Sequence, residues 1–147
     1  MNKRSIIALS TFLFVVLITL FLVSKLQTRE LNSSDYIQSR TPTLFFHGYG
    51  SSANAEKHMA EAARKAGVTQ TIITATVDSH AQVTLKGDIP KDAINPIVIV
   101  EFKDNRNPDY AQDGEYAEAV VRKLQARYGF KKMNSVAHSM GNMSILF

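Results

Sequence analysis

The sequence predicts an α/β fold, a three-layer α/β/α sandwich in which helices cover both faces of a mostly parallel sheet. Strand-like and helical segments alternate along the 147 residues, as they do in such a fold. The run from Pro96 to Phe102 (PIVIVEF) is rich in β-branched residues, which is typical of a strand buried on both faces. An apolar run near the N-terminus adds one predicted transmembrane helix ahead of the sheet.

Residues 1–30 are expected to be a signal anchor with its flanks. The run Ile6–Val23 carries no charge, and as a helix it would span about 27 Å, close to the thickness of a bilayer's hydrocarbon core. Lys3 and Arg4 precede it. A cleaved signal peptide is the alternative, but the segment 22–26 (LVSKL) offers no small-x-small cleavage site. We therefore expect a single-pass protein of the cell membrane with its domain outside the cytoplasm.

The net charge of +4 does not indicate a nucleic-acid partner. Four of the basic residues and one acid lie in the first thirty positions, which leaves 13 Lys and Arg against 12 Asp and Glu from Leu31 onward. The positive net charge therefore reflects the anchor and its flanks rather than a phosphate-binding face. The absence of cysteine excludes disulfides, thiolate metal sites and a cysteine nucleophile. We expect no cofactor and no metal.

A polar tether is predicted at residues 31–42, followed by the domain at residues 43–147. Strand composition and turn residues place five strands, at Thr43–Phe46, Thr69–Val77, Ala81–Lys86, Pro96–Phe102 and Met133–Ala137. Between them the spacing of apolar residues predicts two helices. The first is capped by Ser51 or Ser52 and ends at Gly67, and its apolar face is expected to hold Ala55, Met59, Ala62 and Ala66. The second is capped by Asp113 and ends at Gly129, and one of its faces is expected to hold Tyr116, Val120, Leu124 and Tyr128.

The segment after the last predicted strand has the pattern of a nucleophile elbow. In such an elbow a serine lies on a tight strand-to-helix turn, and the residues two before and two after it must be small so that strand and helix can approach. Ala137 and Gly141 flank Ser139 in this way. A helix-capping serine is the alternative interpretation of the same position.

A glycine-rich loop upstream favours the elbow over the cap. His47-Gly48-Tyr49-Gly50 follows the first predicted strand, where a loop can donate a backbone N–H to a developing oxyanion, and the residue after the nucleophile donates a second. The expected donors are the N–H groups of Tyr49 and Met140. With Ser139 as nucleophile, these are the candidate catalytic residues.

Three stretches carry a resemblance to a known family: the loop at 47–52 (HGYGSS), the segment Asn95–Asn105, and the elbow segment Asn134–Ser144 (NSVAHSMGNMS). They resemble the membrane-bound cell-surface hydrolases of Gram-positive bacteria, which belong to the α/β-hydrolase superfamily. The resemblance implies a lipase- or esterase-like fold, here truncated after the elbow, and a triad in the order Ser, acid, His. The acid and the histidine of that triad would lie beyond the last residue of this sequence.

The four histidines all precede the nucleophile and are poor candidates for its base. His138 is adjacent to Ser139, so its ring is expected to point away from the hydroxyl. His47 is expected to fix the glycine loop, and His58 and His80 to be solvated.

Asp104 and Asp113 are interpreted as surface or capping residues, and Ser144 as structural. The function that these features favour is a serine hydrolase of carboxylic esters or related acyl compounds, with a small-molecule or lipid-like substrate and no activity as a fragment. The alternative is a catalytically silent, membrane-tethered surface domain.

Overall fold

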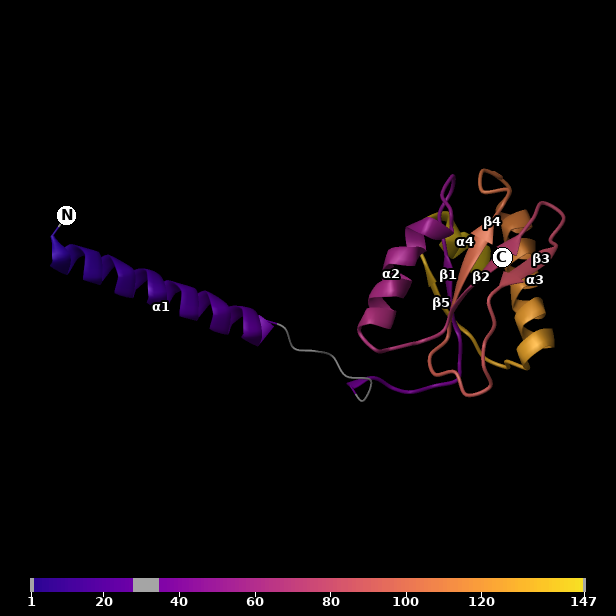
Figure 1. Cartoon of the computed structure of the whole chain (residues 1–147). Helices are drawn as coiled ribbons and strands as arrows, with labels where there is room; N and C mark the ends of the chain where they lie inside the picture. The colour runs from indigo at the N-terminus through magenta and orange to yellow at the C-terminus, as the bar shows by residue number, and fades with distance from the viewer. Residues whose placement is uncertain (1, 28–34, 147) are drawn as a thin grey trace. The chain divides into compact units, whose positions relative to one another are not determined.

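The computed structural model describes residues 2–27 and 35–146 (Figure 1). The chain divides into two compact units, Met1–Leu31 and Asn32–Phe147. The first contains one helix, α1 (Lys3–Gln27). The second contains all of the strands and the remaining helices of the described residues.

Helix α1 exposes large apolar side chains along residues 12–23. Within the described residues, however, no helix is long and apolar enough to cross a membrane. This finding corrects the expectation of a transmembrane helix over Ile6–Val23.

The second unit is an α/β domain with one mixed sheet. Its elements in chain order are β1 (Thr43–Phe46), α2 (Ala53–Lys65), β2 (Ile72–Val77), β3 (Val83–Lys86), β4 (Ile97–Phe102), α3 (Tyr110–Tyr128), β5 (Asn134–Ala137) and α4 (Met140–Leu146). The sheet order is β3-β2-β4-β1-β5, in which only the β2–β3 pair is antiparallel. The predicted α/β class with a mostly parallel sheet is thus confirmed.

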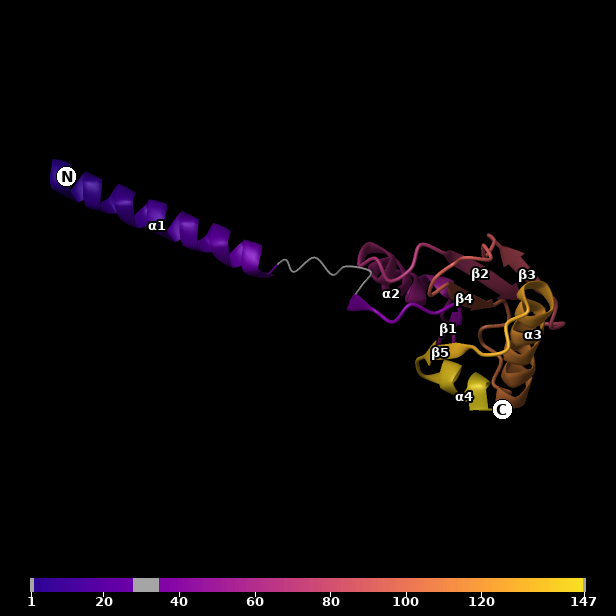
Figure 2. The same ribbon diagram turned by 90° about the horizontal axis from the view of Figure 1, so that it is seen from below.

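Helices lie on both faces of this sheet, with α2 on one side and α3 and α4 on the other (Figure 2). Alternation along β1 supplies both layers, because neighbouring side chains of a strand point to opposite faces. Phe45 packs in a cluster with Ala60 of α2, whereas Leu44 and Phe46 join the larger cluster beneath α3, to which α3 contributes Tyr116 and Val120. β4 is buried on both faces, as its composition predicts.

Several elements begin later or earlier than expected, each for a local reason. β2 starts at Ile72 because the buried Thr69 hydroxyl both accepts from the N–H and donates to the carbonyl of Thr71, which holds a turn there. β3 starts at Val83 because Ala81 lies in a turn with φ 57°. α3 is capped not by Asp113 but by Asp109, whose carboxylate accepts from two backbone N–H groups of the first turn.

Asn95 fastens the segment before β1 to the domain. Its φ is 47°, in the left-handed region that asparagine tolerates better than most residues. The side chain donates to the carbonyls of Ile37 (2.9 Å) and Val68 (3.1 Å) and accepts from the N–H of Ser39 (3.0 Å). The N–H of Asn95 also donates to the Ser39 carbonyl, at 2.6 Å.

The change Asn95→Ala is expected to lower the free energy of unfolding by about 3 kcal/mol, since three side-chain hydrogen bonds are worth about 1 kcal/mol each. Urea unfolding of the whole chain measures it. Asn95→Gly relieves the backbone strain and is expected to cost less than Asn95→Ala. Equal stability of Asn95→Ala and the wild type would show that these bonds do not hold the segment.

Candidate functional site

Ser139 lies on a strained turn between β5 and α4. Its φ is 52°, a value that costs a residue with a side chain about 1–2 kcal/mol. Its carbonyl accepts from the backbone N–H of Asn142 (3.0 Å) and from the Asn142 side chain (3.1 Å), so the start of α4 holds the turn. The Ser139 side chain is exposed. This is the backbone geometry of a nucleophile elbow.

Gly141 lets the helix approach the neighbouring strand. A Cβ at this position would lie 2.6 Å from the carbonyl oxygen of Phe46 and 2.8 Å from that of His47, far inside van der Waals contact. α4 therefore rests directly on the end of β1. Because β1 pairs in parallel with β5, the ends of both strands meet at the same edge of the sheet.

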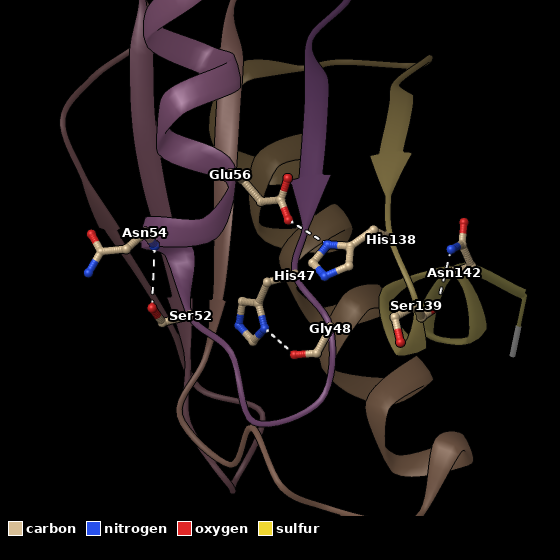
Figure 3. A network of polar contacts seen from close by, with 8 residues as sticks. All are labelled: His47, Gly48, Ser52, Asn54, Glu56, His138, Ser139 and Asn142. Atoms are coloured by element: carbon tan, nitrogen blue, oxygen red, sulfur yellow. Dashed lines mark hydrogen bonds and ion pairs between the residues drawn. The ribbon is translucent and has the colours of Figure 1, made fainter.

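The glycine loop that follows β1 touches the elbow. A Cβ at Gly48 would lie 3.1 Å from the Cβ of Ser139 and 3.0 Å from Nε2 of His138. Figure 3 shows Gly48 and Ser139 on facing segments of this edge. The structure thus brings together the two motifs that the sequence separates by about ninety residues.

His47 fixes the shape of this loop. It is fully buried, and its Nε2 accepts from the backbone N–H of Phe102 at 3.1 Å. The proton must then be on Nδ1, which donates to the Gly48 carbonyl at 2.9 Å. With both ring nitrogens engaged in the core, His47 has no free lone pair for the Ser139 proton.

Residues at the end of β4 and just after it hold the other end of the loop. The N–H of Gly50 donates to the carbonyl of Asn105 at 2.6 Å, and the Asn105 side chain donates to the Ser51 carbonyl. A carboxylate oxygen of Glu101 accepts from the N–H of Ala53, the first residue of α2. The loop is therefore held at three places before any ligand arrives, which is the preorganisation that oxyanion stabilisation needs.

Two backbone N–H groups at this edge remain available. Among the described residues, no acceptor takes a hydrogen bond from the N–H of Tyr49 or from that of Met140. These are the two groups that the sequence predicts as oxyanion donors. Tyr49 is itself 57% exposed, whereas Met140 is buried.

The remaining histidines do not face the Ser139 hydroxyl. His58 and His80 are exposed on α2 and in the β2–β3 turn. His138 turns its ring away from Ser139 and toward Glu56 (Figure 3), and its Nδ1 lies 2.9 Å from the Glu56 carboxylate. Within the described part of the chain, none of the histidines is thus placed as a base for Ser139.

The sequence pattern does not reveal Glu56, because it predicts the apolar face of α2 one position away from the observed buried face. Ala55 and Met59 are exposed, and the helix instead buries Glu56 and Ala60. A helix face that contains a glutamate is not predicted to pack in the core. Its partner is 82 residues later in the sequence, so no local pattern predicts the pairing.

The other candidates have structural surroundings. Ser144 is buried, and its hydroxyl donates to the Met140 carbonyl at 3.4 Å. Asp104 accepts weakly from the Tyr116 hydroxyl at 3.5 Å. Contrary to the expectation of a surface residue, Asp113 is fully buried in the first turn of α3. Among the described residues no cluster of His, Asp and Glu side chains could hold a metal ion.

The fold and this edge of the sheet define an α/β hydrolase: a serine in a left-handed strand-to-helix turn, beside a glycine loop that follows the adjacent parallel strand. The chain belongs to the family described as "Alpha/beta hydrolase of unknown function (DUF915)", whose model matches residues 30–147. The resemblance seen in the sequence is thereby confirmed. Comparison with curated proteins gave no match.

Two solved structures from Gram-positive bacteria are similar to this chain. A gene product of Listeria innocua is 27% identical with a TM-score of 0.66, and the match covers 73% of this chain and 42% of that one. A protein described as a candidate cell surface hydrolase of Lactobacillus plantarum is 17% identical with a TM-score of 0.61, covering 71% and 43%. This chain thus spans less than half the length of either structure.

Proposed function

We propose that this chain is the nucleophile-bearing part of a serine hydrolase that acts on carboxylic esters or related acyl compounds. The observation that carries the proposal is the conformation of Ser139, whose exposed hydroxyl lies on a turn with φ 52° against Gly48. In the loop that contains Gly48, the N–H of Tyr49 has no acceptor among the described residues. A helix cap has no need of a left-handed backbone, because capping residues have extended φ and ψ.

In the proposed reaction, Oγ of Ser139 attacks the carbonyl carbon of the substrate and its proton passes to a base. The carbonyl oxygen gains negative charge, which the N–H groups of Tyr49 and Met140 stabilise. Collapse of this intermediate breaks the ester C–O bond, and the leaving oxygen takes the proton back from the base and departs as the alcohol. Water then hydrolyses the acyl-serine to the carboxylic acid and restores the Ser139 hydroxyl. Since no described histidine faces Ser139, we propose that the chain alone does not turn over esters.

A catalytically silent surface domain is the second candidate function. The observation that favours it is the engagement of His47 and His138 in structural hydrogen bonds, which leaves Ser139 without a base among the described residues. The two candidates differ in whether Ser139 becomes reactive when a base is supplied.

Added imidazole tests this difference. We expect no Ser139-dependent hydrolysis of p-nitrophenyl acetate by the chain alone. With imidazole present, the rate should rise about tenfold above that of Ser139→Ala under the same conditions, a small part of what a positioned base contributes. Ser79→Ala, which removes an exposed hydroxyl elsewhere, should behave as the wild type.

The adduct identifies the reacting group. Mass spectrometry after treatment with a fluorophosphonate and imidazole should find the label on Ser139. If neither an imidazole-dependent rate nor an adduct at Ser139 is found, the silent domain is the better description. Turnover without imidazole that is lost in Ser139→Ala would contradict the proposed inactivity of the chain alone.

We also propose a location at the cell surface. The description of the Lactobacillus plantarum structure supports it, as does α1, whose side chains Phe12, Phe14 and Phe21 are each at least 60% exposed. A helix that is apolar all round is normally covered by protein or lipid. Recovery of the whole chain in the cytosolic fraction of the cell would argue against this location.

A further inference from the structure

A hydrogen bond between a buried carboxylate and an exposed imidazole joins α2 to the elbow. Glu56 is only 2% exposed, whereas the His138 side chain is 56% exposed, and the Glu56 carboxylate lies 2.9 Å from Nδ1 of His138, the residue just before Ser139. Removing a carboxylate from water costs several kcal/mol unless a donor compensates it. Because a carboxylate can only accept, Nδ1 carries the proton of this bond. The fold thus buries the Glu56 carboxylate at a place where it accepts a hydrogen bond from the His138 ring.

The other side of the same ring lies on the glycine loop. The position that a Cβ would take at Gly48 is 3.0 Å from Nε2 of His138 and 3.1 Å from the Cβ of Ser139. One imidazole therefore contacts three segments: α2 through Glu56, the loop at Gly48, and its own strand-to-helix turn. Figure 3 shows the ring between Glu56 and Gly48, with Ser139 beyond it.

The elbow has few other hydrogen bonds to these segments. The N–H of His138 donates to the Phe46 carbonyl at 3.4 Å, a long bond at the end of the sheet pairing. The bonds made by Gly141 and Asn142 stay within the turn itself. The side chain of His138 is thus the main polar link between the elbow and the segments that surround it.

We propose that Glu56 and His138 form a positioning pair that sets the distance between Ser139 and the N–H of Tyr49. Glu56 holds the ring, and the ring holds the elbow against Gly48. Neither residue contacts the reacting atoms. The catalytic consequence rests on the proposed function, because the distance matters to chemistry only if Ser139 attacks and Tyr49 stabilises the oxyanion. The structural claim, that the pair holds the elbow against the loop, does not depend on the proposed function.

Amide hydrogen exchange of the whole chain tests the structural claim without a substrate. Four amides report on the two segments: those of Gly50 and Ser51 in the loop, and those of Gly141 and Asn142 at the elbow, all of which donate hydrogen bonds. In Glu56→Ala and in His138→Ala we expect these amides to exchange about tenfold faster, as the loss of a charge-assisted bond implies. Exchange in the centre of α3 should not change.

A more conservative variant separates the two contacts of the ring. In His138→Asn the side-chain amide nitrogen replaces Nδ1 and can still donate to Glu56, but nothing replaces the atoms that lie on Gly48. We expect the elbow amides to stay near their wild-type rates and the loop amides to exchange faster. His58→Ala, on the exposed face of the same helix, is the matched control and should leave all four amides unchanged.

Two outcomes would overturn the proposal. One is wild-type exchange at the loop and the elbow in both alanine variants. The other is equal acceleration in α3, which would mean that the pair supports only overall stability. If Glu56→Ala fails to fold by circular dichroism, Glu56→Met, which has a similar length but no acceptor oxygen, is measured with the same criterion. The imidazole experiment decides the hydrolase chemistry separately, so either proposal can fail while the other stands.

Discussion

Replacing Gly141 by alanine is expected to lower the free energy of unfolding by about 3 kcal/mol or more, the upper part of the range for overpacked sites. The added methyl group would lie 2.6 Å from the Phe46 carbonyl oxygen and 2.8 Å from that of His47. Both contacts are to backbone atoms of β1 and the residue after it, which cannot rotate away as a side chain would. Relief requires α4 to move off the strand. Urea unfolding of Gly141→Ala against the wild type measures the cost.

Gly129→Ala is the matched control, because it adds the same methyl group where no atom lies within 4 Å. Its φ of 72° still disfavours alanine, at a cost of about 1 kcal/mol. Gly141 has no positive φ, so a cost of Gly141→Ala well above that of Gly129→Ala is attributable to the contact with β1. Equal costs would mean that α4 is not packed as closely as the structure has it. Since moving α4 also moves Ser139, Gly141→Ala should lose any imidazole-dependent hydrolysis.

The sequence predicts the fold where local pattern and burial agree. β4 is buried along nearly all of its length, as its β-branched composition requires, and α3 buries Tyr116, Val120 and Leu124 on one face, as their spacing of four predicts. The end of α3 at Gly129, with φ 72°, follows from the freedom of glycine to adopt that conformation. In these elements the buried residues are the ones that the periodicity of the sequence predicts.

Prediction fails where a distant residue decides. The buried face of α2 is displaced by one position because Glu56 pairs with His138, and a single sequence gives no sign of that pairing. Asn95 lies before a strand in a way that suggests an ordinary turn, yet it binds Ile37 and Ser39, more than fifty residues earlier. Both residues satisfy polar groups across the fold, which no window of local sequence contains.

The sequence predicts the backbone features of the candidate site but not the side chains that hold the glycine loop in place. The elbow and the glycine loop pack so closely that small residues are required around Ser139 and after β1. These small residues form a recognisable sequence pattern. The roles of Glu101 and Asn105, which hold the glycine loop, depend on the loop being near β4. That proximity follows from the β1–β4 pairing, which the order of segments alone does not establish.

Asp113 is the polar group that the fold accommodates least well. Its side chain is fully buried, and neither carboxylate oxygen has a hydrogen-bond partner among the described residues. Burial is the main cause that raises the pKa of this carboxyl from 3.8 to about 6, and the negative charges of Asp104 and Asp109 raise the pKa further in the same direction. The folded protein therefore binds a proton at this site at pH values where the unfolded chain has lost it.

The sign of the resulting pH dependence follows from that difference. Below about pH 4 the carboxyl is protonated in both states and adds no cost of a buried charge, whereas above about pH 6 the folded state carries that charge. Stability is thus lost as the pH rises from about 4 to about 6. The shift corresponds to about 3 kcal/mol, at about 1.4 kcal/mol for each pKa unit. A neutral side chain of the same shape should remove this loss.

Asp113→Asn is accordingly expected to be more stable than the wild type by about 2–3 kcal/mol at pH 7.5, and to approach or fall below it at pH 4. Urea unfolding at the two pH values measures the difference, and Asp92→Asn, which removes an exposed charge, should leave the wild-type pH dependence in place. An advantage of equal size at both pH values would place its cause in packing rather than in ionisation. If the pH dependence of stability disappears only in Asp113→Asn, its cause is the ionisation of Asp113. In that case α3 is held less strongly to the sheet when this buried carboxyl loses its proton.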